Sequence, residues 1–501
     1  MKNSTIFIFL FLSVCFSQVI QVGSGSYTKS FPGTDAAGRN GYPSGQPQTT
    51  GPAAQKHAPT NDWWSYVIKN DHANNLFNYP LALKTVSSGL VTSYIPWGVF
   101  DDQEPIIVGL TGLSASKAKV YDFTDWTVTL DWTDSNNSLK ATAGIGMPFV
   151  YFTKDDASTV EIEINLGQVS VSGEKIIVEN ARNGADFVIY GPTGSTWQIS
   201  GNKYTSSLNG NNYWSLVMLP QNTNNINAVV NDLQKYAYVF PQNTSVEWYY
   251  NENNSYVYTD YLIEVDVKEG VYNNVLQGLL PHQWSNLSDE SAYPDEYTYN
   301  SVRGELKMLN GNSFSTKNIF TGILPTLPSL GQYSQYYNPA ELQNKISQIE
   351  NNQLATWTDS YNEGQVMNRL IQTGRIAHEI GNPEARDLII ETVKERLEDW
   401  LTASTPEVAF IFYYNTNWST LIGYPAGHGQ DNNINDHHFH WGYFIHAAAF
   451  IEQFQPGWAN NWGEMVNHLV RDAASPNRND PDYPFLRSFS PFAGHCWANG
   501  F

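Results

Sequence analysis

The chain has 501 residues, a formal net charge of −21 and many aromatic side chains, including 16 Trp and 30 Tyr. A chain of this length is expected to form two or three domains rather than one. Its acidic balance argues against nucleic acid as a partner, because the phosphates would be repelled. With 14% aromatic but only 15% charged residues, the composition suits a soluble protein that acts on a neutral polymer.

The chain begins with a segment that has the composition of a secretory signal peptide. Met1–Ser17 contains one lysine, an apolar run and a final small residue, and the run is too short to span a bilayer. We therefore expect a secreted, extracellular protein without membrane attachment after cleavage. Residues 18–54 are predicted to form a flexible lead rich in Gly, Ser and Pro. If cleavage follows Ser17, Cys496 is the only remaining cysteine, so core burial must stabilise the fold.

Residues 55–275 are dominated by segments in which apolar and polar side chains alternate, most clearly at 126–132, 160–164 and 261–267. This period of two, interrupted by turns rich in Asn and Gly, predicts antiparallel sheets with one buried face. No fixed-period repeat appears, which disfavours a propeller or a solenoid. We predict a β-sandwich domain over 55–275 and a small α/β linking domain over 276–341.

The spacing of apolar residues becomes helical from residue 342 onward. Helical segments are predicted over 366–380, 388–400 and 462–470, with Gly381–Pro383 as a stop between the first two. Consecutive antiparallel helix pairs of this kind predict a helical bundle or a toroid over 342–501.

One stretch within this region, Leu421–Tyr443, has an unusual composition and reads LIGYPAGHGQDNNINDHHFHWGY. Its Gly, Asn and Asp residues favour a loop, and a helix is predicted from Gly442 to Phe454. Asp436 therefore lies near a loop-to-helix junction. Three histidines and three large aromatic residues follow it closely in the sequence: His437, His438, His440, Phe439, Trp441 and Tyr443. A carboxylate in such company is typical of a cleft that binds a flat, polar and hydroxylated molecule.

Two other interpretations of this stretch remain open. Asp436 could serve only as a helix N-cap, which stabilises a helix by about 1 kcal/mol. His437 and His440 could bind a metal with His446, but zinc sites need further ligands at defined spacing, and neither an HExxH nor a CxxC pattern occurs. We expect no metal and no other cofactor.

The segment NDHHFHWGYFIHAAA, with LIGYPAG before it and LVRDAASPNRNDPDYPFLRSFSPFAGHCWANG after it, resembles glycoside hydrolase family 81, the endo-1,3-β-glucanases. The resemblance extends over about residues 55 to 501. Five further stretches resemble the family in the same order: NDWWSY, YPLAL, LLPHQW, RGELK and FTGILPTLP. This family resemblance implies that the helical region is an (α/α)6 barrel.

The resemblance also implies a mechanism. Glycosidic cleavage needs a carboxylic acid that protonates the leaving oxygen and a second carboxylate that activates water or attacks carbon. The family's general acid corresponds to Asp436. Its general base comes from a segment with two Glu four residues apart, beyond the GHCWANG-like motif, whereas this sequence ends at Phe501. Residues 342–501 also provide about half the length that twelve helices need. We therefore expect a C-terminally truncated chain with an incomplete barrel.

Further residues near the motif are predicted to contact a sugar. The position of Asp472 in the matching motif implies that it binds or orients sugar, the alternative being an ion pair with Arg471, Arg478 or Arg487. The remaining candidates for substrate binding are Tyr424, His437, His440, Tyr443, His495 and Trp497.

The leading hypothesis is a secreted, inverting endo-1,3-β-D-glucanase, a monomer when full length, that acts on β-1,3-glucan such as laminarin, curdlan or cell-wall glucan. The second hypothesis is a non-catalytic protein that binds β-1,3-glucan. The third is a metalloenzyme or metal-binding protein that uses His437 and His440.

Overall fold

The computed structural model describes residues 18–34, 38–97, 103–221, 223–288, 297–325, 331–350, 358–404 and 407–500. The predicted signal peptide, Met1–Ser17, lies outside these residues. The chain forms two compact units. Unit 1 comprises the described residues of Met1–Pro43, Pro328–Asn432 and Phe439–Asp472, and unit 2 comprises those of Ser44–Leu327, Asn433–His438 and Ala473–Phe501.

Unit 2 contains two large antiparallel sheets. The six-stranded sheet has the order β14-β15-β10-β5-β4-β3 and is formed by β3 (Ala82–Val86), β4 (Gly89–Ser93), β5 (Ile106–Leu110), β10 (Val160–Ile164), β14 (Gln198–Ser200) and β15 (Lys203–Ser206). The eight-stranded sheet has the order β11-β12-β13-β16-β9-β8-β7-β6 and is formed by β6 (Lys119–Phe123), β7 (Thr127–Thr133), β8 (Ser138–Gly144), β9 (Phe149–Lys154), β11 (Gln168–Ser172), β12 (Lys175–Arg182), β13 (Ala185–Tyr190) and β16 (Tyr213–Met218).

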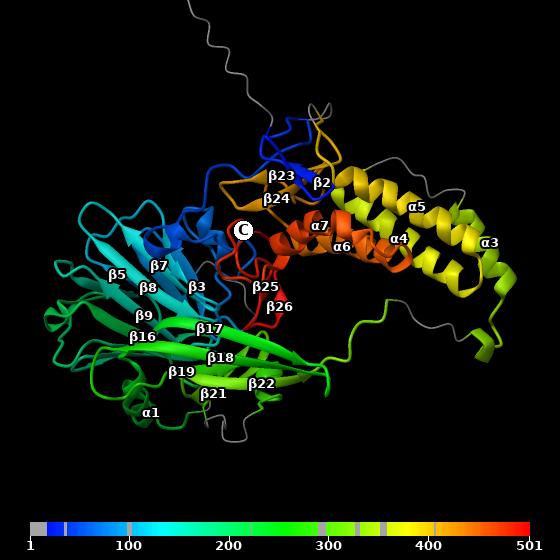
Figure 1. The fold of residues 1–501 in the computed structure, drawn as a ribbon. Coiled ribbons are helices and arrows are strands. Elements are labelled where there is room, and N and C mark those ends of the chain that lie inside the picture. Colours follow the sequence, from blue (N-terminus) through cyan, green and yellow to red (C-terminus); the bar gives the residue numbers. More distant parts are fainter. Residues whose placement is uncertain are drawn as a thin grey trace, which may run out of the picture. The chain divides into compact units, whose positions relative to one another are not determined.

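The strands of both large sheets can be followed in Figure 1, and the alternation of buried and less buried side chains along them explains why they form. In β10, Val160, Ile162 and Ile164 are buried while the two glutamates between them are only partly buried. The two large sheets contact each other. In one such contact, the Nε1–H of Trp132 on β7 donates to the carbonyl of Val86 on β3 over 2.9 Å. The antiparallel sheets predicted from the period of two are confirmed.

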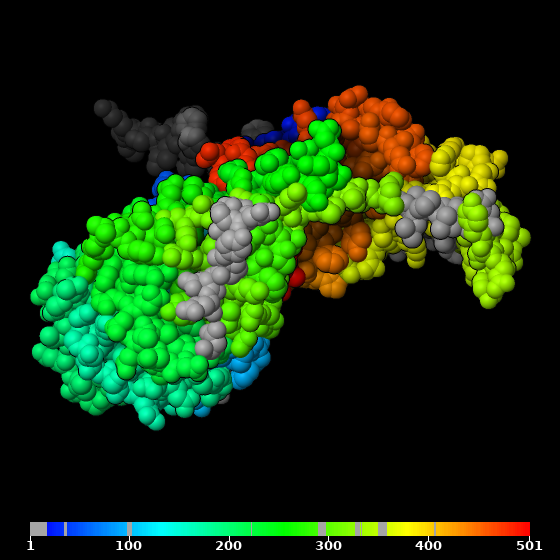
Figure 2. All heavy atoms as spheres, turned by 90° about the horizontal axis from the view of Figure 1, so that it is seen from below, coloured from blue at the N-terminus to red at the C-terminus, as the bar shows by residue number. Residues whose placement is uncertain are grey.

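Three smaller sheets complete unit 2. They are formed by β17 (Val239–Asn251), β18 (Tyr256–Val267) and β22 (Ser313–Ile319), by β19 (Leu276–Leu279), β21 (Gly304–Asn310) and β20 (Thr298–Ser301), and by β25 (Phe489–Ser490) and β26 (His495–Cys496). Besides short 3-10 turns, the complete α-helices among the described residues of unit 2 are α1 (Ile226–Leu233) and α2 (Pro281–Trp284). The strands β17, β18 and β22, green to yellow-green, form part of the surface in Figure 2.

Unit 1 contains a four-stranded sheet and the longer helices. The sheet has the order β1-β2-β23-β24 and is formed by β1 (Val19–Val22), β2 (Gly25–Thr28), β23 (Ile411–Asn415) and β24 (Thr420–Tyr424). The helices are α3 (Pro339–Glu350), α4 (Ser360–Glu379), α5 (Pro383–Trp400), α6 (His437–Phe454) and α7 (Ala459–Ala474), of which α6 and α7 each place two residues in unit 2.

Local signals set the ends of α4 and α5, which pack against each other (Figure 1). The carboxylate of Asp359 accepts from the backbone N–H groups of Tyr361 and Asn362, both over 3.0 Å, and so caps α4. The side chain of Asn382 caps α5 by accepting from the N–H of Ala385 over 3.0 Å. The predicted stop between these two helices is confirmed.

The structure differs from the flexible lead predicted for residues 18–54, because β1 and β2 lie within it. A Cβ on Gly25 would lie 2.8 Å from the carbonyl oxygen of Leu401 and from the side chain of Met465, so the backbone of β2 passes too close to other elements for any side chain. The hydroxyl of Ser26 donates to the carbonyl of Ala403 over 3.1 Å. These contacts anchor β2 within unit 1.

The compact units also differ from the predicted helical domain over 342–501, since residues 433–438 and 473–501 belong to unit 2. No helix in the described part of the chain is long and apolar enough to cross a membrane.

Candidate functional site

Asp436 directly precedes α6 and has a left-handed backbone. Its φ is +56°, and Ile434, two residues before it, has a φ of +53°. Aspartate tolerates this region at some cost, whereas a β-branched residue rarely adopts it. The Asp436 side chain is partly buried and that of Ile434 fully buried. Strained backbone of this kind persists only where surrounding contacts hold it, and it is frequent at functional sites.

The contacts that hold Asp436 come from the last described residues of the chain. The backbone N–H of Asp436 donates to the carbonyl of Ala498 over 2.9 Å. The backbone N–H of Gly500 donates to Oδ1 of Asn435, also over 2.9 Å. Nearby in sequence, the rings of His495 and Trp497 are 4.7 Å apart, and Trp497 is 5.5 Å from Phe77. The structure therefore places Asp436, His495 and Trp497 in unit 2.

The histidines that follow Asp436 differ in exposure. His437 is fully buried and His438 partly buried. Burial lowers the pKa of His438, although the carboxylate of Asp436 opposes this effect, and the lowered pKa favours a neutral imidazole at neutral pH. His440 lies in unit 1, where its Nδ1 is 2.8 Å from the hydroxyl of Ser360. The ring of His440 is fully buried, with the ring of Tyr361 5.5 Å away.

Among the predicted substrate-binding residues that lie in unit 1, Tyr443 is the one whose side chain is partly exposed. Its ring is 6.2 Å from that of Tyr361. It lines a hollow of about 370 Å³ with five residues of α4: Asn362, Gln365, Val366, Asn368 and Arg369. Burial raises the pKa of the Tyr443 hydroxyl, which therefore stays protonated and able to donate a hydrogen bond.

Asp472 and Tyr424 are fully buried within unit 1. The carboxylate of Asp472 accepts from the hydroxyl of Thr420 over 3.1 Å, from the N–H of Leu421 over 3.0 Å and from Nε1–H of Trp441 over 2.6 Å. These bonds tie α7 to β24 and α6.

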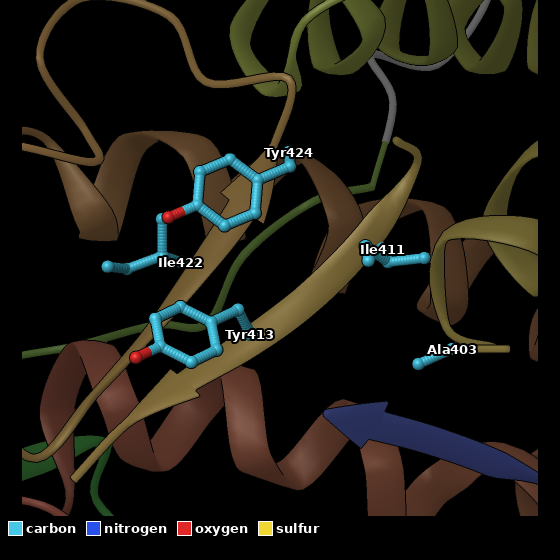
Figure 3. Packing of buried hydrophobic residues seen from close by; sticks show 5 residues of the cluster. All are labelled: Ala403, Ile411, Tyr413, Ile422 and Tyr424. Carbon is cyan, nitrogen blue, oxygen red and sulfur yellow. The ribbon is translucent and has the colours of Figure 1, made fainter. Parts of the chain in front are cut away.

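Tyr424 packs in a hydrophobic cluster with Tyr413 and its neighbours (Figure 3), and its hydroxyl donates to the carbonyl of Gly41. Burial raises the pKa of this hydroxyl. In this structure both Asp472 and Tyr424 contribute packing and internal hydrogen bonds rather than a surface for a ligand.

A polar hollow lies beside the segment that carries Asp436. It measures about 340 Å³ and is lined by Tyr66, Lys69, Asn70, Asn433, Asn435 and Asn499, all in unit 2. Nζ of Lys69 donates to Oδ1 of Asn433 over 3.3 Å. Amide, ammonium and phenol groups beside a tyrosine ring are suited to the hydroxyls and the flat faces of a sugar.

The sequence analysis assigned no role to Asn61 and Asp62, which lie in the NDWWSY stretch. Asn61 is buried, and its Nδ2 donates to the carbonyl of Ala498 over 3.0 Å. Burial raises the pKa of Asp62 to about 7, a hydrogen bond from the N–H of Trp63 opposes this shift, and the charge of Asp125 adds to it. In the sequence, Asn61 and Asp62 stand between Thr60 and two tryptophans, and no spacing there indicates either of these contacts.

A larger cavity of about 510 Å³ in unit 2 is lined by both Asp62 and Asp125. Asp125 forms an ion pair with Arg478 over 2.6 Å, and Arg478 also pairs with Glu247 over 2.9 Å. Across the described ranges of the chain, no group of three His, Cys, Asp or Glu side chains is placed to hold a metal ion.

Comparison with known proteins gives one consistent family. Residues 336–501 match the Glycosyl hydrolase family 81 C-terminal domain. A solved structure of a glycoside hydrolase family 81 protein from Clostridium thermocellum superimposes with a TM-score of 0.88 at 34% sequence identity, covering 96% of this chain and 67% of that one. The chain belongs to glycoside hydrolase family 81. The resemblance first seen in the DHHFH motif is thereby confirmed.

Two curated relatives carry the name glucan endo-1,3-beta-D-glucosidase. The protein from Thermobifida fusca is 34% identical over 96% of this chain and 64% of its own length. The protein from Acetivibrio thermocellus is 36% identical over 89% of this chain and 58% of its own length. The chain thus spans about three fifths of the length of these relatives.

Proposed function

We propose that this protein is a secreted endo-1,3-β-D-glucanase that cleaves internal bonds of β-1,3-glucan with inversion at the anomeric carbon. The observation that carries the proposal is the geometry of Asp436, whose carboxyl is presented from strained, clamped backbone at the start of a helix. Its position in the family 81 motif and the names of the two relatives support the choice of substrate. We further propose that the helices of unit 1 form part of an (α/α)6 barrel.

In the proposed mechanism, Asp436 is the general acid that protonates the departing glycosidic oxygen. A protonated carboxyl is needed for this step, because an alkoxide is a poor leaving group. A second carboxylate, to which we assign no residue, would activate the attacking water at about 6.5 to 9.5 Å from the acid, as inverting enzymes require. His438, whose pKa is lowered by burial, would add no positive charge beside Asp436 at neutral pH.

Exposure divides the predicted binding residues into two groups. We keep the partly exposed Tyr443, His495 and Trp497 as sugar contacts, because aromatic faces pack on the C–H faces of sugars. To the fully buried residues we assign support of the fold around the site: Tyr424, His437, His440 and Asp472. The hollow lined by Tyr66 and Lys69 is a further candidate for holding a glucosyl unit.

The test is Asp436→Asn in the protein translated from its full transcript. Asparagine is one of the few residues that tolerate a positive φ, so the backbone should remain as it is while the acidic proton is lost. We expect release of reducing ends from laminarin to fall at least about 100-fold, as is typical for loss of a general acid. Binding to insoluble curdlan should be retained.

Asp387→Asn is the matched control, because this exposed aspartate lies on α5 beside Arg386. Its activity should equal that of the parent protein. Near-normal activity of the Asp436→Asn protein would contradict the assignment of the acid. Binding to curdlan without cleavage by the parent protein would instead support a glucan-binding protein.

A further inference from the structure

The backbone at Asp436 is held by a chain of hydrogen bonds that starts from buried side chains in a distant part of the sequence. The carbonyl of Ala498, which accepts from the N–H of Asp436, also accepts from Nδ2 of Asn61 over 3.0 Å. The same amide group donates to the carbonyl of Trp497 over 3.2 Å. One buried side chain therefore fixes two consecutive carbonyls, and one of these carbonyls fixes Asp436.

The orientation of the Asn61 amide is determined by two further residues. Nη1 of Arg487 donates to the hydroxyl oxygen of Thr60 over 2.9 Å. Since a guanidinium can only donate, the Thr60 hydroxyl accepts this bond and gives its own hydrogen to Oδ1 of Asn61, 3.1 Å away. The NH₂ group of Asn61 must then face the carbonyls. All three side chains are at most 1% exposed, so water does not compete for these bonds.

The other side of the Asp436 segment is fixed by Gly500. Its N–H bonds to Asn435, and a Cβ at this position would lie only 1.9 Å from the carbonyl oxygen of Asn433. Holding Asp436 in the left-handed region has an energetic cost that contacts elsewhere must offset. The two sets of contacts, from Asn61 through Ala498 and from Gly500, oppose relaxation of this strained backbone.

We propose that Asn61 is a positioning residue for Asp436, and that Thr60 and Arg487 hold the Asn61 amide in the orientation that this role requires. The catalytic part of this inference rests on the proposed function, in which Asp436 is the general acid. Positioning matters because an error of about 1 Å at a reacting group can cost about 100-fold in rate.

The experiment compares Thr60→Val with Thr60→Ser. Valine has the shape of threonine without the hydroxyl, so it breaks both bonds of Thr60, whereas serine retains them. On laminarin we expect Thr60→Val to lower kcat about 10- to 100-fold with KM changed less than about twofold, and Thr60→Ser to restore kcat. Thr142→Val is the control, because it removes a similar hydroxyl contact, to Thr129 over 2.8 Å, in the eight-stranded sheet of the same unit.

Hydrogen–deuterium exchange provides a readout that does not need activity. The amide of Asp436 should exchange at least about tenfold faster in Thr60→Val and in Asn61→Ala, while peptides from the large sheets exchange as in the parent protein. Unchanged exchange at Asp436 would overturn the inference, as would exchange that rises everywhere or failure of both variants to fold. The two proposals can fail separately. If Asp436→Asn keeps full activity while Thr60→Val accelerates exchange at Asp436, the proposed role of Asp436 as general acid is wrong, but the inference that Asn61 positions Asp436 is supported.

Discussion

The carboxyl of Asp62 in unit 2 has a pKa far above the ordinary value of an aspartate, which its position in the sequence does not suggest. Burial raises its pKa from 3.8 to about 7, the bond from the Trp63 N–H opposes the rise, and the negative charge of Asp125 adds to it. At a pH between these two pKa values, the Asp62 carboxyl is protonated in the folded protein and ionised in the unfolded chain. The free energy of unfolding must therefore fall as the pH rises from about 4 to about 7.

The substitution Asp62→Asn tests this linkage. Asparagine retains an oxygen that can accept from the Trp63 N–H, but it never ionises. The free-energy cost of ionising a buried carboxyl at this position therefore disappears. Measured against the parent protein, its free energy of unfolding should be nearly equal at pH 4 and higher at pH 8, by at most about 4 kcal/mol at 1.36 kcal/mol per pKa unit. Chemical denaturation at both pH values measures the difference.

Asp134→Asn is the control with the opposite sign. The N–H groups of Asn136 and Ser114 bond the Asp134 carboxylate and hold its pKa below the ordinary value. This carboxylate contributes stability above its unfolded pKa, and that contribution is lost as the pH falls through the folded pKa. Its asparagine variant should therefore be less stable than the parent at neutral pH, and the two should converge in acid. Two variants with the same pH trend would contradict the interpretation of Asp62.

At the scale of elements, α4 and α6 meet at a glycine that leaves room for a ring. A Cβ on Gly364 would lie 2.5 Å from Cδ2 of Tyr443, whereas a Cβ on Gly442 would have nothing within 4 Å. Alanine is favoured over glycine in a helix by about 1 kcal/mol, but overpacking costs about 1 to 3 kcal/mol. The two glycines should therefore respond to the same substitution in opposite directions.

We expect Gly364→Ala to lower the free energy of unfolding by about 1 to 2 kcal/mol and Gly442→Ala to raise it by up to about 1 kcal/mol. Urea denaturation measures both. Stabilisation by both substitutions would show that the ring of Tyr443 moves aside without cost.

Local pattern predicted many of these elements but not their long-range contacts. The strands at 160–164 and 261–267 and the helices α4, α5 and α7 follow from spacing alone. The helix α6 begins at His437, five residues before the start at Gly442 that the apolar spacing predicted. The role of Asn61 could not be predicted, since its partner Ala498 is 437 residues away.

Asp472 is a second residue whose long-range contacts could not be predicted from the local sequence pattern. Its position in the family 81 motif suggested a group that binds or orients sugar. Its carboxylate instead accepts from Trp441 and Thr420 inside unit 1, and periodicity cannot distinguish these two orientations. The composition around Asp436, by contrast, did indicate a junction between a loop and a helix, because loop formers precede it and helical spacing follows within a few residues.

At the scale of the whole molecule, the two units alternate along the chain. The chain crosses between them five times, and only six residues, Asn433–His438, join unit 2 between two stretches of unit 1. Each unit nevertheless has its own core. Fully buried tryptophans lie in both: Trp400, Trp418 and Trp441 in unit 1, and Trp64, Trp126, Trp132 and Trp214 in unit 2.

Separate cores predict separate unfolding transitions, because cooperativity follows the contacts that are lost together. In differential scanning calorimetry at pH 8 we expect two transitions. Gly364→Ala should lower only the transition of unit 1, by about 2 to 4 °C per kcal/mol, and Asp62→Asn should raise only that of unit 2. A single transition shifted by both substitutions would show instead that the five crossings couple the units, and the strained segment at Asp436 would then be stabilised by the whole molecule rather than by unit 2 alone.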